Sequence, residues 1–221
     1  MTTTAVTPGS IGILGAGRVG AAVARRAIDS GCEVRIATAK PAKEIALLAE
    51  IVTPGAVAVD APELADADLT VIAIPLRRYR DLDPVHFAGR TVVDVMNYWS
   101  PTDGVQPDFE RDARSTSEII QGHLQGALLV KSLNHIGYHD LEADHRAPGA
   151  ADRRALAVAS DHEQSRALVA SFIDRIGFDA VDAGPLAAGR LLQPGTEVFN
   201  GSHSAAQLRG LLAEACLGAR A

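Results

Sequence analysis

Residues 10–20 read SIGILGAGRVG and carry the clearest structural signal in the chain. Ser10–Leu14 is a continuous apolar run, as expected of a strand that is buried on both faces of a sheet. The six residues that follow match the pattern GxGxxG, and an Ala-rich periodic segment from Gly17 to about Asp29 predicts a helix. A strand, a glycine turn and a helix in this order are typical of the first unit of a dinucleotide-binding domain.

The glycines of this turn have separate expected roles. Gly15 permits the tight turn, and Gly17 lacks a side chain, so that a pyrophosphate can approach the backbone. Gly20 lets the helix pack close to the sheet, with the helix N-terminus facing the phosphates. The predicted cofactor-binding residues are therefore those of the whole turn, Gly15, Ala16, Gly17, Arg18, Val19 and Gly20. The Arg18 side chain could lie over the adenine side of the cofactor as a further cation. A glycine-rich turn without a ligand is the alternative.

Short apolar runs alternate with helical patterns along the rest of the chain. Further strands are expected at Glu33–Thr38, Ala56–Val59, Leu69–Ile74, Thr91–Val95, Ala127–Leu133, Arg154–Ser160 and Phe178–Asp182. Helices are expected at Lys43–Glu50, from Ser115 to about Gln125, at His162–Ile176, and through much of the Ala/Leu-rich C-terminal segment. This alternation predicts an α/β fold, a Rossmann-type doubly wound, mainly parallel sheet with a small C-terminal helical appendage. We expect residues 1–150 to form the dinucleotide-binding domain and residues 151–221 a small C-terminal α/β extension that completes the acceptor cleft.

The end of the second predicted strand indicates which dinucleotide binds. In NAD-binding versions an acidic residue near this point holds the ribose hydroxyls. Here the strand ends in Ile36-Ala37-Thr38-Ala39-Lys40, which contains no acid. A threonine hydroxyl and a lysine suit the 2′-phosphate, so Thr38 and Lys40 favour NADP(H). A merely solvated Lys40 is the alternative.

The composition argues against several classes of protein. Hydrophobic residues make up 47% of the 221 residues and charged residues 22%, which is typical of a globular chain and not of a disordered one. The net charge of −6 argues against a nucleic-acid partner. No apolar run approaches the ~20 residues that a membrane span requires. Isolated Cys32 and Cys216 fit reduced thiols, and the N-terminus lacks a secretory pattern, so we expect a cytoplasmic protein that acts on small molecules.

Several segments together resemble one family. They are ILGAGRVG (13–20), VIAIP (71–75), VVDVMN (92–97), SEII (117–120), VKSLNHI (130–136) and VDAGPLAAGRLL (181–192). Over roughly residues 10 to 200 the chain resembles the deazaflavin (coenzyme F420)-dependent NADP oxidoreductases and related short reductases. Larger dehydrogenases with the same start continue into a long helical dimerisation domain, for which this chain is too short.

The resemblance implies direct hydride transfer between NADP(H) and coenzyme F420, in a cleft between the Rossmann domain and the C-terminal part. It implies that Ile74 and Pro75 lie beside the cofactor ribose and Asn97 near the nicotinamide. The predicted acceptor-binding residues are Ser132, Asn134, His135 and Ile136, with Trp99 available for stacking. The chain departs from the family where Tyr98-Trp99 follow Asn97, and in the longer loops 100–114 and 138–152. These departures surround the acceptor side.

His135 and Asn97 are the candidate catalytic residues. His135 is expected just beyond a strand's C-terminal end, where open α/β sheets bind ligands, and it could stabilise the negative charge that a hydride brings to the deazaflavin. A loop histidine bonded to the backbone is the alternative. Gly137 interrupts the His135–His139 spacing, so we expect no metal site, and we expect His139 and His145 to be exposed.

Two rival functions stay open. The first is a reductase on the same scaffold with another acceptor, such as an imine, a flavin or a small carbonyl compound, in which His135 or Tyr138 would donate a proton. The second is a non-catalytic NADPH-binding module. Homodimerisation through the helix expected at Ser204–Leu217 is plausible, and packing of that helix within one chain explains its apolar face equally well.

Overall fold

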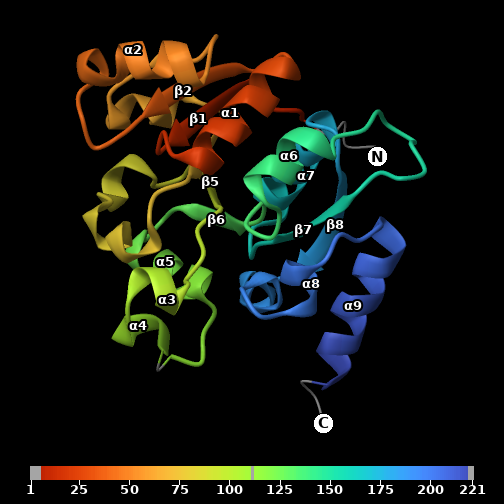
Figure 1. Ribbon diagram of the computed structural model, residues 1–221. Coiled ribbons are helices and arrows are strands. Elements are labelled where there is room, and N and C mark those ends of the chain that lie inside the picture. Colours follow the sequence, from red (N-terminus) through yellow and green to blue (C-terminus); the bar gives the residue numbers. More distant parts are fainter. Residues whose placement is uncertain (1–5, 111, 219–221) are drawn as a thin grey trace.

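The apolar runs of the sequence become the strands of one sheet in the computed structural model, which describes residues 6–110 and 112–218 (Figure 1). The strands are β1 (Ser10–Leu14), β2 (Glu33–Ala37), β3 (Val57–Ala58), β4 (Leu69–Ile72), β5 (Thr91–Asp94), β6 (Leu128–Lys131), β7 (Ala155–Ala159) and β8 (Asp179–Gly184). Their order across the sheet is β3-β2-β1-β4-β5-β6-β7-β8, and each neighbouring pair is parallel except β6 and β7. The predicted fold class, a doubly wound and mainly parallel α/β sheet, is confirmed. Each predicted strand is present and ends within two residues of its expected bounds.

Helices cover both faces of this sheet. The α-helices are α1 (Arg18–Asp29), α2 (Ala42–Val52), α3 (Ser100–Asp103), α4 (Pro107–Glu110), α5 (Thr116–His123), α6 (Tyr138–Ala143), α7 (Glu163–Arg175), α8 (Glu197–Asn200) and α9 (Ala205–Gly218). Four 3-10 helices are also described: η1 (Ala61–Asp66), η2 (Leu76–Asp81), η3 (Pro84–His86) and η4 (Leu186–Leu192). None of the helices among the described residues has the length and apolar character that crossing a membrane requires.

Alternate residues of the central strands feed two separate cores. On β4, Val71 packs with α1, α2, α6 and α7, whereas Ile72 faces the core formed by η1, η2 and α5. Figure 1 shows α1, α6 and α7 next to one another over the first face. Because side chains alternate along a strand, both faces are buried and the central strands read as unbroken apolar runs.

The C-terminal segment adds two strands to the same sheet. β7 pairs with β6 only through Lys131 and Ala159, and β8 then pairs in parallel with β7. The sheet therefore continues across the predicted boundary at residue 150, and the division into two domains stays a prediction. On one face of this extension, Leu208 and Leu212 of α9 are buried in a third core. The apolar face of α9 is thus used within the chain, and homodimerisation stays a prediction.

Local sequence signals explain how two of the helices begin. At α5 a capping box is present, because the Ser115 hydroxyl accepts from the Glu118 N–H and the Glu118 carboxylate accepts from the Ser115 N–H. The helix expected at His162–Ile176 begins one residue later, at Glu163. His162 is the capping residue, and the Asp161 carboxylate instead accepts from the Leu186 N–H at 2.9 Å. Asp161 therefore ties η4 to the sheet.

Candidate functional site

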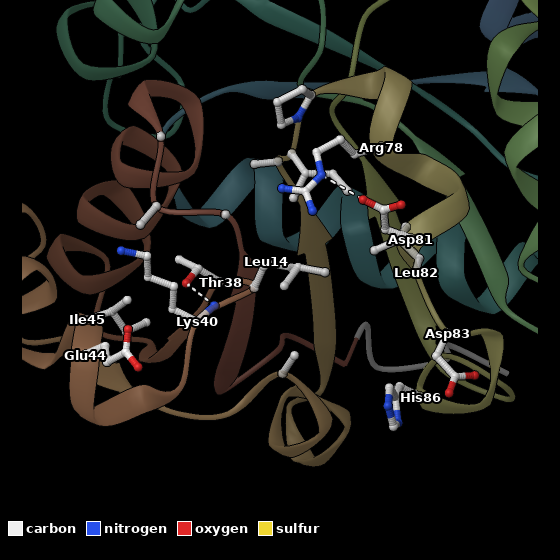
Figure 2. A pocket seen from close by; sticks show the side chains of 18 of the residues that line it. Leu14, Thr38, Lys40, Glu44, Ile45, Arg78, Asp81, Leu82, Asp83 and His86 are labelled. Carbon is white, nitrogen blue, oxygen red and sulfur yellow. Dashed lines mark hydrogen bonds and ion pairs between the residues drawn. The ribbon is translucent and has the colours of Figure 1, made fainter.

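The strand order reverses at β1, and this is where a cavity opens. The chain leaves β1 toward β2 on one side and later returns to β4 on the other side. Ligands of open α/β sheets bind at such a switch point, beyond the carboxyl ends of the strands. A cavity of about 660 Å³ lies there, lined by residues at the ends of β1, β2 and β4 and by η2 and η3 (Figure 2).

The three motif glycines have three different roles, and two of them, Gly15 and Gly17, line this cavity. Gly15 has a φ of +116°, and a Cβ on it would collide with the carbonyl of Ala73 at the end of β4. A Cβ on Gly20 would collide with the Gly15 carbonyl oxygen. A Cβ on Gly17 would meet no atom within 4 Å, so this glycine is not required by packing. Its bare backbone borders the cavity instead, as expected for close approach of a phosphate.

The start of α1 is left open toward the same space. Gly17 is the N-cap residue and provides no side-chain hydrogen bond to the first turn of the helix. Its carbonyl accepts from the Ala21 N–H at 2.8 Å. The first N–H groups of a helix lack partners within the helix and carry its positive dipole end. A glycine cap therefore leaves the N–H groups of Arg18, Val19 and Gly20 as donors for an anion.

Thr38 and Lys40 follow β2 beside the glycine turn, because the Gly15 N–H donates to the carbonyl of Ala37, the last residue of β2, at 2.8 Å. The Lys40 N–H donates to the Thr38 hydroxyl at 3.0 Å, which leaves the hydroxyl hydrogen free to point at a ligand. Both residues line the cavity, as do Ile74 and Pro75 at the end of β4. Glu44, in the first turn of α2, lines it too. Sequence reasoning missed this acid because it inspected only the strand end.

Arg18 lies outside the larger cavity. It borders a second one of about 400 Å³ between α1 and α6, together with Tyr138 and His139. Its guanidinium lies 5.7 Å from the centroid of the Tyr138 ring and donates to the Tyr138 hydroxyl at 3.4 Å. His139 is exposed, as expected, and so is His145.

Asn97 and Asn134 bind each other across the ends of β5 and β6. The Asn97 side-chain amide donates to the Asn134 backbone carbonyl at 2.7 Å, and the Asn134 amide donates to the Asn97 side-chain oxygen at 2.9 Å. Asn134 also donates to the Leu192 carbonyl at 2.5 Å. Asn97 is half-buried, whereas Asn134 is 4% exposed. Asn134 therefore joins β5, β6 and η4 rather than facing a ligand.

His135 and Ser132 are bound to β7. The Ala157 N–H donates to His135 Nε2 at 2.9 Å, and the Ser132 hydroxyl donates to the Ala157 carbonyl at 2.7 Å. These side chains continue the hydrogen-bonding between β6 and β7 past its single backbone pair. Leu133, the one non-glycine residue with positive φ among residues 6–110 and 112–218, lies between them at φ 60°.

The side chains of the 132–136 loop were expected to face the acceptor, but their hydrogen bonds are made within the protein. All four predicted acceptor residues of this loop are buried: Ser132, Asn134, His135 and Ile136. Burial lowers the pKa of His135 to about 3, and the charges of Lys131, Arg154 and His203 act in the same direction. His135 thus has the arrangement that the sequence left as the alternative, a histidine bonded to the backbone. The sequence did not show that β7 would cover the loop. Only Trp99 of the predicted acceptor residues is well exposed, at 50%.

A buried ion pair lies beneath this region. The Lys131 ammonium is 3.2 Å from the Asp94 carboxylate and also donates to the Met96 carbonyl, while the Ser117 hydroxyl donates to Asp94 at 2.6 Å. Burial lowers the pKa of Lys131, and the charge of Asp94 acts in the opposite direction. Sequence reasoning gave these residues no role, although a charge at the end of each of two adjacent apolar strands was a signal for such a pair. Lys131 fixes the backbone immediately before Asn97.

The comparisons with known proteins agree with this geometry. Residues 10–98 match the model of the family described as NADP oxidoreductase, coenzyme F420-dependent. No curated protein sequence matches the chain. The structure is similar to a hypothetical protein from Sinorhizobium meliloti, with a TM-score of 0.76 and 25% identity over 90% of this chain and 95% of that one.

Two further solved structures extend the comparison. A candidate F420-dependent NADP reductase from Arthrobacter sp. fb24 has a TM-score of 0.68 and 26% identity over 81% of this chain and 86% of that one. An imine reductase from Pseudomonas sp. shares the fold at 18% identity and a TM-score of 0.56, with 83% of this chain covering 58% of that one. The family match and the reductase-like neighbours support an NADP-dependent oxidoreductase.

Proposed function

We propose that this protein transfers a hydride between NADP(H) and a deazaflavin, coenzyme F420. One observation carries the cofactor half of the proposal. The cavity at the switch point is bordered by Gly17, where a side chain would meet open space, and by an α1 N-terminus without a side-chain cap. The acceptor half is supported by the family match over residues 10–98 and by the similarity to the Arthrobacter protein.

The residues of the cavity fit a dinucleotide phosphate. Backbone N–H groups of the glycine turn would hold the pyrophosphate, and Thr38 with Lys40 would hold the 2′-phosphate. Ile74 and Pro75 would lie beside the ribose, where β4 ends against Gly15. When bound, NADP(H) supplies or takes up the hydride, and the protein has to align the two rings and exclude water.

The 132–136 loop fits a reaction in which it supplies no proton. Both nitrogens of His135 are engaged inside the protein, so this residue is not available to protonate a carbonyl or imine product. A deazaflavin takes the hydride into a conjugated ring that delocalises the negative charge, and water supplies the proton that completes the reduced product, so no donor from the 132–136 loop is required. Trp99 offers an exposed aromatic face for a ring system, and contacts of this kind contribute on the order of 1 kcal/mol beyond area burial.

The direct assay follows reduction of the deazaflavin by NADPH, through the loss of the deazaflavin's visible absorption. The proposal expects turnover that depends on both compounds. Oxidation of NADPH by an imine, a flavin or a carbonyl compound, with the deazaflavin inert, would replace the acceptor. Binding of NADPH without turnover of any acceptor would instead indicate a non-catalytic module.

Gly17→Ala tests the glycine turn itself. Its φ of −77° is open to alanine and its Cβ would meet no protein atom, so we expect the variant to fold like the wild type. The added methyl group would occupy the space through which the phosphate approaches, so we expect NADPH affinity to fall about tenfold or more, equivalent to about 1.4 kcal/mol. Isothermal titration of both proteins measures this.

Gly122→Ala is the matched control. Gly122 lies in α5, far along the chain from the turn, and its Cβ would also meet no atom within 4 Å. This variant should bind NADPH like the wild type. Unchanged affinity in Gly17→Ala would mean that the pyrophosphate does not cross the glycine turn.

A further inference from the structure

Arg78 projects into the cofactor cavity from the wall opposite Lys40. It belongs to η2, which begins directly after β4 and Pro75. Figure 2 shows its guanidinium in the cavity, across from Thr38 and Lys40. No motif marked this residue in the sequence, because its place depends on how the chain turns after β4.

One edge of the Arg78 guanidinium is held by a neighbouring carboxylate. Arg78 Nε donates to Asp81 Oδ2 at 2.7 Å, within the same 3-10 helix. Across residues 6–110 and 112–218, its two terminal nitrogens make no hydrogen bond with the protein. Asp81 thus orients the guanidinium through one edge, and the side chain of Arg78 is itself about half exposed.

The charges on the two walls differ. The Arg78 wall also carries Asp81 and Asp83, whose carboxylates would repel a phosphate dianion. Lys40 and the Thr38 hydroxyl stand on the other wall with one carboxylate, that of Glu44, so a phosphate would meet less repulsion there. The surface next to Arg78 is apolar, with the largely buried side chains of Leu82 and Phe87 lining the same cavity. A planar, neutral, aromatic group fits beside Arg78 better than a phosphate does.

We propose that Arg78 packs the face of its guanidinium against the adenine ring of the cofactor, with Asp81 as the residue that positions it. This inference rests on the proposed function, because it assumes that the cavity takes the adenosine half of a nicotinamide dinucleotide. A guanidinium over an aromatic face is attracted by the ring's π electrons. The contact does not involve the 2′-phosphate, so it serves NADP and NAD equally.

The expected equal effect of Arg78 on NADP and NAD binding can be tested. Isothermal titration measures Kd for NADP⁺ and for NAD⁺ on the wild type, Arg78→Ala and Lys40→Ala. For Arg78→Ala we expect both Kd values to rise by the same factor, about threefold to thirtyfold. For Lys40→Ala we expect the Kd of NADP⁺ to rise and that of NAD⁺ to stay close to the wild-type value. A loss confined to NADP⁺ in Arg78→Ala, or no loss at all, would overturn the proposal.

Two more variants make the result specific. Arg78→Lys keeps the charge and removes the planar face, so it should weaken both coenzymes as Arg78→Ala does, and wild-type affinity in this variant would also overturn the proposal. Arg77→Ala is the matched control, because Arg77 is equally exposed, pairs with Asp103 at 3.7 Å and does not line the cavity. A wild type that binds neither coenzyme would refute the proposed function itself. Wild-type binding with an unaffected Arg78→Ala refutes only the role of Arg78.

Discussion

At the scale of single residues, the two nitrogens of the His135 ring define its role. Nε2 accepts from the Ala157 N–H at 2.9 Å, so the proton of the neutral ring lies on Nδ1, 3.3 Å from the Asn134 side-chain oxygen. A protonated ring would lose the bond to Ala157 and would hold a charge in a site that is 4% exposed. His135 therefore stays neutral in the folded protein and contributes to stability only in that form.

This predicts how stability depends on pH. The pKa of His135 is about 3 in the folded protein, against 6.5 for an unperturbed histidine, so between these values the unfolded chain binds more protons than the folded one. Stability from this group is full above about pH 6.5 and is lost as the pH falls toward 3. Within this window each pH unit should lower the free energy of unfolding by up to about 1.4 kcal/mol. Urea unfolding at a series of pH values measures the slope.

His135→Gln removes the titrating group while keeping an acceptor for Ala157. We expect its free energy of unfolding to fall less steeply below neutral pH than that of the wild type. His139→Gln, at an exposed position, should keep the wild-type slope. Parallel curves for the wild type and His135→Gln would show that His135 titrates normally.

The glycine turn and His135 also show what a sequence can reveal about a site. Gly15, Gly17 and Gly20 were predictable because their roles depend on a turn and a helix that adjoin them in the chain. The partner of His135 is Ala157, on a strand that inserts antiparallel beside β6. No local pattern in the sequence encodes that pairing. The 132–136 loop was therefore expected to face a ligand, whereas its side chains bind β7 beside β6.

At the scale of elements, the longer strands and helices were predictable because their apolar periodicity persists over several residues. The short helices α3, α4 and α6, and the 3-10 helices η1, η2 and η3, were not. The stretch from Trp99 to Arg114 was expected as a polar loop, and long-range bonds organise it: the Tyr79 hydroxyl and Arg80 both bind Asp108, at 2.8 Å in each case. Such contacts depend on tertiary structure and leave no periodic signal.

The ion pair that joins β5 to β6 gives a prediction at this scale. Lys131 and Asp94 are each fully buried, so removal of one leaves the other charge without its partner. Lys131→Met should lower the free energy of unfolding by about 3–5 kcal/mol. Asp94→Asn should also be strongly destabilising, and the double variant should lose clearly less than the sum of the two, because the partners interact directly. Urea unfolding of the three variants measures the coupling.

Lys43→Met serves as the comparison for this series. Lys43 is exposed on α2, and its substitution should change the free energy of unfolding by less than about 0.5 kcal/mol. Additive losses in the double variant would mean that Lys131 and Asp94 act through separate contacts, with Met96 and with Ser117 respectively.

At the scale of the whole molecule, one cavity joins the ends of β1, β2 and β4 with η2 and η3. A ligand that bridges these elements binds the folded chain and not the unfolded one, so it must stabilise the whole fold. The two coenzymes should differ in how much they stabilise the fold, because only NADP⁺ has a 2′-phosphate that can contact Thr38 and Lys40. NADP⁺ and NAD⁺ differ only in the 2′-phosphate, and a charge-assisted contact to it is worth about 1.5–3 kcal/mol.

The thermal unfolding temperature should therefore rise more with NADP⁺ than with an equal, saturating concentration of NAD⁺. For a chain of this size the expected difference is about 3–12 °C. Lys40→Ala should remove most of the difference by lowering the effect of NADP⁺ alone, and Lys43→Ala should leave it unchanged, because Lys43 does not line the cavity. Glu44 works against the phosphate, so Glu44→Gln should widen the difference. Equal shifts for both coenzymes in the wild type would show that the end of β2 does not select the 2′-phosphate.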